Sequence, residues 1–327
     1  MLWIGRRESV GIGVESTRGV GVAPSYWLNC LSFTFKDVPT RAVSEAGFGG
    51  IWAGDQAPKT MEHAEGEFEI EVGDQSLGAL LVAVFGDSPS TSGPTDTAAY
   101  THTFTLSNTN QHKSLTIHTV DPIGQLVYEM AMIDTFELRV EPDSIITARV
   151  SFISKGSTTS AGQSASYGAE KKFVGRYLTF KVASDTSGLD AASAISLKSL
   201  ILRFEKNAEA QATLSTVQPE DIVNKRFNIS GEIVLNYEDR TWLNYVKNAS
   251  DKAVRIDIVH EDTITGCAST KYQFRLDLSK VAFESWDSDF AMDDVVTQTL
   301  SFTAFYDAGG NNNVVNSCYL VNGVTSY

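Results

Sequence analysis

Basic residues and long hydrophobic runs are both scarce in this sequence. Its 327 residues include 26 Lys and Arg against 40 Asp and Glu, which gives a formal net charge of −14. A nucleic-acid binder, or a protein that docks on anionic lipid, needs a basic surface, so neither tight DNA binding nor membrane docking is expected. The longest apolar run, residues 77–85, is far short of the roughly 20 residues that a membrane helix needs. The N-terminus also lacks the apolar region of a secretory signal.

The residues that usually carry chemistry are few and poorly spaced for it. Cys30, Cys267 and Cys318 form an odd set without a C-x-x-C pair, so neither a disulfide framework nor a zinc site is expected. The five histidines form no H-E-x-x-H pair, and no G-x-S-x-G elbow is present. Acidic residues gather at 284–294 without the spacing of a calcium loop. We therefore expect reduced thiols in a protein made in a cytoplasm, no enzyme activity, no catalytic residue, no cofactor and no metal site.

Apolar and polar residues alternate through most of the chain. Residues 31–35 read Leu-Ser-Phe-Thr-Phe and residues 68–72 read Phe-Glu-Ile-Glu-Val, and similar runs recur at 148–152, 233–237 and 300–305. A period of two with β-branched and aromatic residues is typical of half-buried antiparallel strands. The predicted fold class is therefore all-β.

The order of predicted elements is the same in the two halves of the chain. Each half has a strand, a long loop, a strand that opens with Gly-Glu, one short helix and three further strands. Gly66-Glu67 corresponds to Gly231-Glu232. The matched segments are 31–37, 66–72, 76–85 (helix), 114–120, 125–138 and 145–153 with 200–206, 231–237, 240–248 (helix), 253–259, 272–285 and 295–305. This collinear set predicts two duplicated β-rich modules, with a period too long for a solenoid.

Composition places the boundaries of these modules. Residues 156–170 are mostly Gly, Ser, Thr and Ala, which predicts a flexible linker near the midpoint of the chain. A Gly-Asn run after residue 307 predicts a loosely specified end. The expected organisation is an N-terminal arm at 1–30, a first module at 31–155, a linker at 156–171, a second module at 172–307 and a C-terminal tail at 308–327.

Three carboxylates fall on one face of a predicted strand. Glu67, Glu69 and Glu71 alternate with apolar residues, so they point to the same side. Because three like charges on one strand face repel each other, that face needs water. It is either an ordinary outward-facing surface or the lining of a wet, negatively charged channel. The matched second-half strand offers Glu232 and Asn236 on the equivalent face.

The N-terminal arm and the element order together resemble a known family. Gly5-Arg6 is followed by Gly11-Ile12-Gly13-Val14-Glu15-Ser16-Thr17-Arg18-Gly19, by Trp27 and then by an alternating strand. Over residues 5–306 this pattern resembles the tail tube (major tail) proteins of long-tailed, siphovirus-type bacteriophages. The resemblance implies that each module is a tail-tube-like β-sandwich or barrel.

The resemblance also implies a function. Such proteins are structural virion proteins that stack as rings into a hollow tube, and DNA passes through the lumen without tight binding. The implied partners are further copies of the chain and the tail terminator and tail-tip proteins, in a virion tail assembled in the host bacterial cytoplasm. Single-module members form rings of six, so two modules per chain favour a trimer with pseudo-six-fold symmetry over a hexamer. An acidic lumen wall would carry Glu67, Glu69, Glu71, Glu232 and Asn236.

The loop at 38–65 is the predicted contact between subunits. It carries Phe48, Ile51 and Trp52 among glycines, and long loops in compact domains are usually functional. The resemblance implies that this loop reaches a neighbouring ring or subunit; alternatively, its apolar side chains fold back on their own core. The alternative function is a two-domain β-sandwich that binds carbohydrate or a cell surface through exposed aromatic residues.

Overall fold

The computed structural model describes residues 2–52, 54–290, 292–310 and 312–327. Within these ranges all strand pairings are antiparallel, so the all-β prediction is confirmed. The alternation read from the sequence has its expected cause. In β13 (Ser199–Glu205), for example, Leu200, Leu202 and Phe204 are buried on one face, and Arg203 is exposed on the other. No helix in the described ranges is long and apolar enough to cross a membrane.

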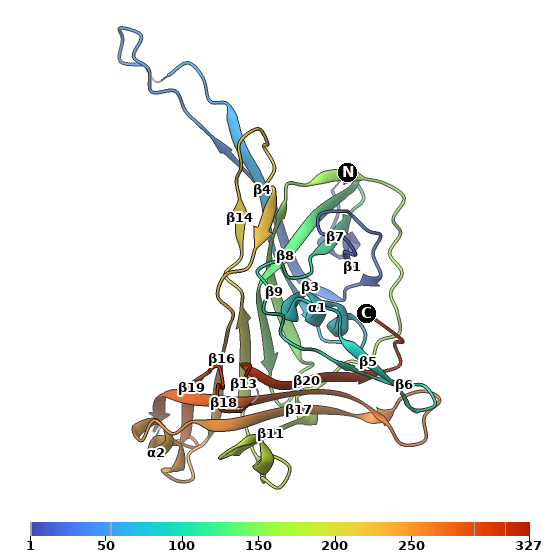
Figure 1. The fold of residues 1–327 in the computed structure, drawn as a ribbon, viewed down its shortest axis with the longest axis vertical. Helices are drawn as coiled ribbons and strands as arrows, with labels where there is room; N and C mark the ends of the chain where they lie inside the picture. Colours follow the sequence, from blue (N-terminus) through green and yellow to red (C-terminus); the bar gives the residue numbers. More distant parts are fainter. Residues whose placement is uncertain (1, 53, 291, 311) are drawn as a thin grey trace.

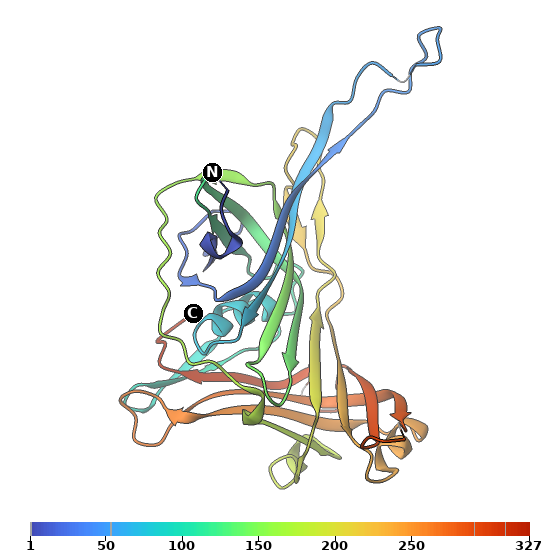
Figure 2. The same cartoon turned by 180° about the vertical axis from the view of Figure 1, so that it is seen from behind.

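One long antiparallel sheet runs through both halves of the chain (Figures 1 and 2). Its hydrogen-bonded order is β3-β4-β9-β8-β13-β16-β19-β18. The halves join where β8 pairs with β13, from Thr135 opposite Glu205 to Val140 opposite Leu200. The strands of this long sheet are β3 (Cys30–Arg41), β4 (Lys59–Glu71), β9 (Thr147–Lys155), β8 (Gln125–Val140), β13, β16 (Asn228–Asn236), β19 (Thr297–Ala304) and β18 (Lys271–Asp289).

The pairing scheme of the first half recurs in the second. Gly66 of β4 is opposite Phe152 of β9, and Gly231 of β16 is opposite Phe302 of β19. A Cβ at Gly66 would lie 2.6 Å from Cζ of Phe152, and the ring of Phe302 likewise leaves no room at Gly231. Gly66 and Gly231 lie inside β4 and β16, and not at the strand openings that the sequence predicts. Each glycine has the same physical reason, which is a phenyl ring packed against the neighbouring backbone.

A second layer covers the apolar face of the long sheet. In the first half it contains β1 (Ser9–Val14), β2 (Tyr26–Trp27), β7 (Leu115–Val120) and the start of β8. In the second half it contains β11 (Leu178–Ala183), β12 (Ala194–Ile195), β17 (Lys252–Thr263) and the start of β18. Residues 9–14 of the expected N-terminal arm are thus an interior strand, in which Val10 and Ile12 are fully buried.

The two helices have different environments. Every residue of α1 (Ser76–Phe85) is buried, and Phe85 packs against Phe204 of the second half with ring centroids 6.0 Å apart. In α2 (Thr241–Lys247) only Trp242 is buried. Among the described residues the main apolar cluster spans both halves of the chain, so the halves share one core.

The segment between the halves and the end of the chain both make specific contacts. Residues 156–171 contain β10 (Thr158–Ser160), which pairs with β8, and Glu170, whose carboxylate accepts hydrogen bonds from the backbone N–H and hydroxyl of Ser76. The expected C-terminal tail contains β20 (Val315–Asn322), which lies between β18 and β6 (Ala99–Thr103). β6 also pairs with β5 (Ser90–Asp96). The remaining short elements are β14 (Glu209–Gln211), β15 (Asp221–Val223) and the 3₁₀ turns Gly5–Arg7, Gly175–Tyr177 and Thr186–Gly188.

Candidate assembly surface

The long sheet has one apolar face and one polar face. Glu67, Glu69 and Glu71 of β4 lie on the polar face, opposite the side of Phe68 and Ile70, which are each 1% exposed. Glu232 and Asn236 of β16 lie on the same face, at positions that pair with β19 as Glu67 and Glu71 pair with β9. We call the side of the sheet that carries these five residues the polar face.

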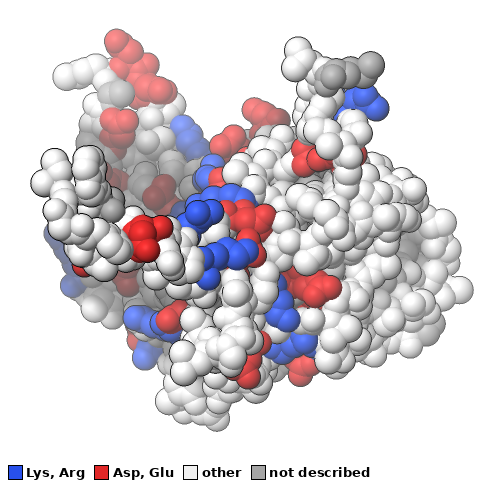
Figure 3. All heavy atoms as spheres, turned by 90° about the horizontal axis from the view of Figure 1, so that it is seen from above, with Lys and Arg blue, Asp and Glu red and all other residues white. Residues whose placement is uncertain are grey.

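The carboxylates of the polar face are interleaved with arginines. Arg149 of β9 is opposite Glu69, and its guanidinium donates hydrogen bonds of 2.7 Å to both carboxylate oxygens of Glu67. The Glu67 hydrogen bond raises the pKa of Arg149 above its ordinary value. Seen along the long axis, acidic and basic side chains lie next to each other (Figure 3). The repulsion expected within the three glutamates is therefore relieved by a neighbouring strand, which no inspection of β4 alone could reveal.

The junction between the halves is held by an ion cluster on this polar face. Glu137 of β8 accepts a hydrogen bond of 2.8 Å from Nε of Arg203 on β13 and one of 2.5 Å from Nε of Arg139. Burial opposes ionisation of Glu137, but these hydrogen bonds outweigh it and hold its pKa below the usual value. The sheet thus continues from one half to the other through backbone pairing and a paired charge.

Equivalent hollows lie on the polar face of the two halves. One is lined by Thr34, Lys36, Glu67 and Ser151, and the other by Ile201, Arg203, Glu232 and Ser301, among other residues. Next to them, the hydroxyls of Thr135 and Ser151 are 2.7 Å apart, and those of Ser285 and Ser301 are 2.5 Å apart. The two halves of the polar face therefore have the same hollow as well as the same order of strands.

Both ends of the long sheet are open edges. In the described part of the chain, β3 pairs with β4 on one side and with no strand on the other. At the other end, β18 pairs with β19 over Val281–Asp289. Its other edge is covered by β17 only up to Val281, and no described strand covers 282–289. Unpaired N–H and C=O groups on such edges are templates for pairing with another chain.

The connection between β3 and β4 projects beyond the rest of the molecule (Figures 1 and 2). Its apolar residues do not fold back on the core, because Phe48 is 60% exposed, Ile51 98% and Trp52 78%. The corresponding second-half loop behaves differently. Its Ile222 is fully buried against Met130 and Met132 of the first half, so this loop belongs to the body of the protein.

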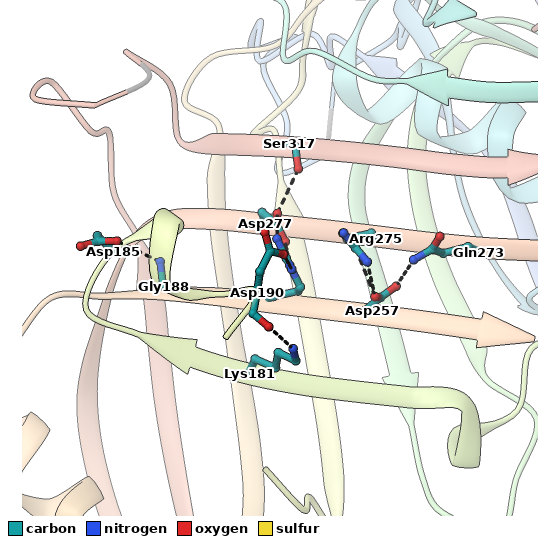
Figure 4. A network of polar contacts seen from close by, with 10 residues as sticks. Lys181, Asp185, Gly188, Asp190, Asp257, Gln273, Arg275, Asp277 and Ser317 are labelled. Carbon is teal, nitrogen blue, oxygen red and sulfur yellow. Dashed lines mark hydrogen bonds and ion pairs between the residues drawn. The ribbon is translucent and has the colours of Figure 1, made fainter. Parts of the chain in front are cut away.

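A polar network ties the outer layer of the second half together (Figure 4). Arg255 of β17 is 8% exposed and donates hydrogen bonds of 2.7 and 2.9 Å to the two carboxylate oxygens of Asp277 on β18. Its third nitrogen bonds Asp190 at 2.5 Å. Arg275 similarly holds Asp257 at 2.7 Å. These charges are paired within the network, and the described residues contain no cluster that could hold a metal ion. The network therefore connects β17 to β18 and has a structural role.

Comparison with known proteins agrees with the architecture. The model of the phage tail tube protein family matches residues 5–304. No curated protein sequence matches the chain. The family is one of structural components of the virion tail. Since the match spans almost the whole of an all-β chain with two open sheet edges, this chain belongs to the phage tail tube protein family.

Proposed function

We propose that this protein self-assembles into stacked rings that form the tail tube, a hollow conduit for DNA during ejection. The observation that carries the proposal is the long sheet with its repeated strand order and two open edges. A sheet that is open at both ends is completed without free edges when identical copies close into a ring. Because each chain contributes two equivalent units, three chains give a ring with pseudo-six-fold symmetry.

The polar face is proposed to line the lumen. It carries Glu67, Glu69, Glu71, Glu232 and Asn236, and the chain has a net charge of −14. A hydrated acidic wall repels the DNA backbone, so DNA slides instead of binding. The arginines on this face do not offer a phosphate site of the usual kind, because Arg149 and Arg203 already bond carboxylates. Water in the lumen also keeps these charged groups solvated.

The projecting connection of β3 and β4 is proposed to contact a neighbouring ring. Phe48, Ile51 and Trp52 expose apolar surface at the far end of the molecule, where a stacked ring would meet it. At the ends of the tube the same surfaces would meet the tail terminator and the tail-tip proteins. Assembly would take place in the host bacterial cytoplasm, and no enzymatic step or cofactor is invoked.

Negative-stain electron microscopy of the concentrated protein tests this function. We expect rings or tubes whose end views show six similar lobes. Sedimentation of the ring fraction gives its mass, which should equal three chains of 35.6 kDa. A protein that stays monomeric across the concentrations tested contradicts self-assembly, and a ring of six chains contradicts the trimer.

A further inference from the structure

We propose that neighbouring chains join by seating the β18–β19 corner of one copy against β3 and the N-terminal 3₁₀ turn of the next. In this contact β18 of one copy pairs with β3 of the next in the same register as β8 pairs with β13 inside each chain. The contact rests on the proposed ring assembly and adds to it the identity of the residues at the seam. The occupant is a second copy of this chain, because the first half leaves open a site whose equivalent in the second half is occupied from within the chain.

The filled site lies where the first half meets the second. The turn after β8 packs so closely on Gly175 that a Cβ there would collide with the backbone of Glu141. Gly175 N–H donates a hydrogen bond of 3.0 Å to the carbonyl oxygen of Ser144, and the adjacent Val174 forms a β-bridge with Ile145. This turn therefore fits into a preformed socket of the second half.

The open site is the equivalent socket of the first half. Gly5-Arg6-Arg7 forms a 3₁₀ turn before β1, as Gly175-Arg176-Tyr177 does before β11. A pocket beside Gly5 is lined by Arg6, Glu8, Leu31 and Phe33, among others. The pocket beside Gly175 has Arg176, Leu178, Lys198 and Leu200 in the corresponding places, and the turn after β8 forms one of its walls. A Cβ at Gly5 would meet no atom within 4 Å, so no described residue packs on Gly5 as Glu141 packs on Gly175.

The strand that leads into the β18–β19 corner matches the strand that leads into the turn in the second-half socket. A bulge interrupts β8 between Ile133 and Thr135, and another interrupts β18 between Phe283 and Ser285. Both bulges stand at the same place, since Ile133 is opposite Phe152 and Phe283 is opposite Phe302. Residues 285–289 of β18, together with Phe290 after it, therefore correspond to residues 135–140 of β8.

This correspondence fixes which residues meet at the seam. Inside the chain, Arg203 is opposite Glu137 and Leu200 is opposite Val140. The equivalent pairs between chains are Lys36 with Asp287 and Phe33 with Phe290. A basic residue thus faces an acidic one at both junctions: Arg203 faces Glu137 inside the chain, and Lys36 faces Asp287 between chains. Asp289 adds a second carboxylate near Lys36. This charge complementarity is independent of the strand pairing that led to the register.

The proposed seam also accounts for exposed apolar side chains. Val140 is 3% exposed at the internal junction, whereas its counterpart Phe290 is 60% exposed. Val174 and Ile145 form a bridge, whereas their counterparts Ile4 and Val295 are 66% and 62% exposed. Phe290 and Val295 lie on the surface of one copy, and Ile4 lies on the surface of the next. The proposed seam would bury all three side chains.

Charge reversal tests the ion pair. Lys36→Glu and Asp287→Lys should each raise the protein concentration needed for half-assembly at least about tenfold, because like charges then face each other at every seam. The double variant Lys36→Glu with Asp287→Lys should recover most of the loss. Lys247→Glu, on α2, is the matched control and should assemble as the unchanged protein does. Thermal unfolding of each monomer verifies that it is folded. A double variant no better than the two single variants overturns the pairing.

Disulfide trapping tests the register. Directly opposite residues of antiparallel strands have Cα atoms about 4.5–5.5 Å apart, which suits a disulfide. Lys36→Cys with Asp287→Cys should give chains cross-linked into covalent trimers under oxidation, whereas Thr34→Cys with Asp287→Cys should not. Rings that form but cross-link only in the second variant overturn the register and leave the proposed function intact. Failure of the unchanged protein to form rings overturns both.

Discussion

The ammonium of Lys206, which follows β13 in the second half, donates a hydrogen bond of 2.7 Å to the carbonyl oxygen of Ala83 in the last turn of α1. Carbonyls at the end of a helix have no partner within the helix, and a cation there also meets the negative end of the helix dipole. Lys206 is fully buried, and among the described residues its ammonium also donates a hydrogen bond of 3.2 Å to the sulfur of Met132. One side chain thus connects the two halves at the cost of burying a charge.

This burial predicts a pH-dependent stability. Burial, with a smaller contribution from Arg18, lowers the pKa of Lys206 to about 7, whereas an unfolded lysine keeps its proton to about pH 10.4. Between these values the unfolded chain binds more protons, so the free energy of unfolding rises with pH, by up to about 1.4 kcal/mol per pH unit. Lys206→Met should remove this rise between pH 7 and 9 in urea unfolding. Lys225→Met, which removes an exposed lysine, should retain it; equal slopes in all three proteins contradict the prediction.

Breaking the Arg255–Asp277 pair should destabilise the protein strongly. Asp277 is 4% exposed, so Asp277→Asn removes the buried carboxylate that the Arg255 guanidinium bonds twice and leaves only the exposed Asp190 as a counter-charge, and the free energy of unfolding should fall by about 3 kcal/mol. Asp190→Asn removes the other carboxylate that Arg255 bonds, but Asp190 is solvent-exposed, and its loss should have a much smaller effect. Chemical denaturation of both variants measures the difference. A larger loss of stability in Asp190→Asn than in Asp277→Asn would contradict this prediction.

Trp52 should matter for assembly and not for folding. Trp52→Ala removes an exposed side chain whose burial against a partner contributes roughly 1.5–3 kcal/mol, repeated in every subunit. We expect fewer and shorter tubes, measured by sedimentation and electron microscopy, with an unchanged monomer unfolding curve. Ile123→Ala removes an equally exposed side chain outside this loop and should assemble normally. Tubes of normal length from the Trp52 variant would exclude the loop as a contact.

Reversing charge on the polar face should affect DNA passage. Replacing Glu67, Glu69 and Glu71 by Lys leaves the apolar side of β4 intact, so tubes should still assemble. The new lysines, together with the released Arg149, would hold the DNA backbone and slow its ejection, less so in high salt. Phage carrying this variant would be compared with phage in which the exposed residues Asp185, Glu238 and Glu261 become Lys, an equal change in charge. An assembled structure with the three glutamates on the outer surface would disprove the lumen assignment.

Part of this structure could be predicted because it depends on local sequence. Alternation with a period of two places Phe68 and Ile70 on one face and Glu67 and Glu69 on the other, whichever strand lies alongside. The helix at 76–85 is predicted from its apolar run, which begins two residues after Asp74, a residue type that is common at helix N-termini. The repeated Gly-Glu opening of two strands predicts that both occupy the same kind of position, and the pairing of Gly66 and Gly231 with phenylalanines shows what that position is.

The contacts between distant segments could not be predicted in this way. Nothing in β4 indicates that Arg149 neutralises Glu67, because the two residues are 82 positions apart and meet only through the register of β9. Residues 156–171 have a linker composition, yet Glu170 bonds the start of α1. The expected C-terminal tail likewise supplies β20, since the unpaired edge of β18 and the polar groups of β6 make a place for a further strand.

The sequence by itself thus determined the strands, their two-sided character, the order shared by the two halves and the family. Each of these follows from side-chain periodicity and from residue types that are close together along the chain. Only the tertiary structure decided which strands are neighbours, where the sheet stays open, and which charges meet across it. The hydrogen bonds that pair strands depend on the path of the whole backbone, and a shift of one residue in register would reverse the face of every side chain.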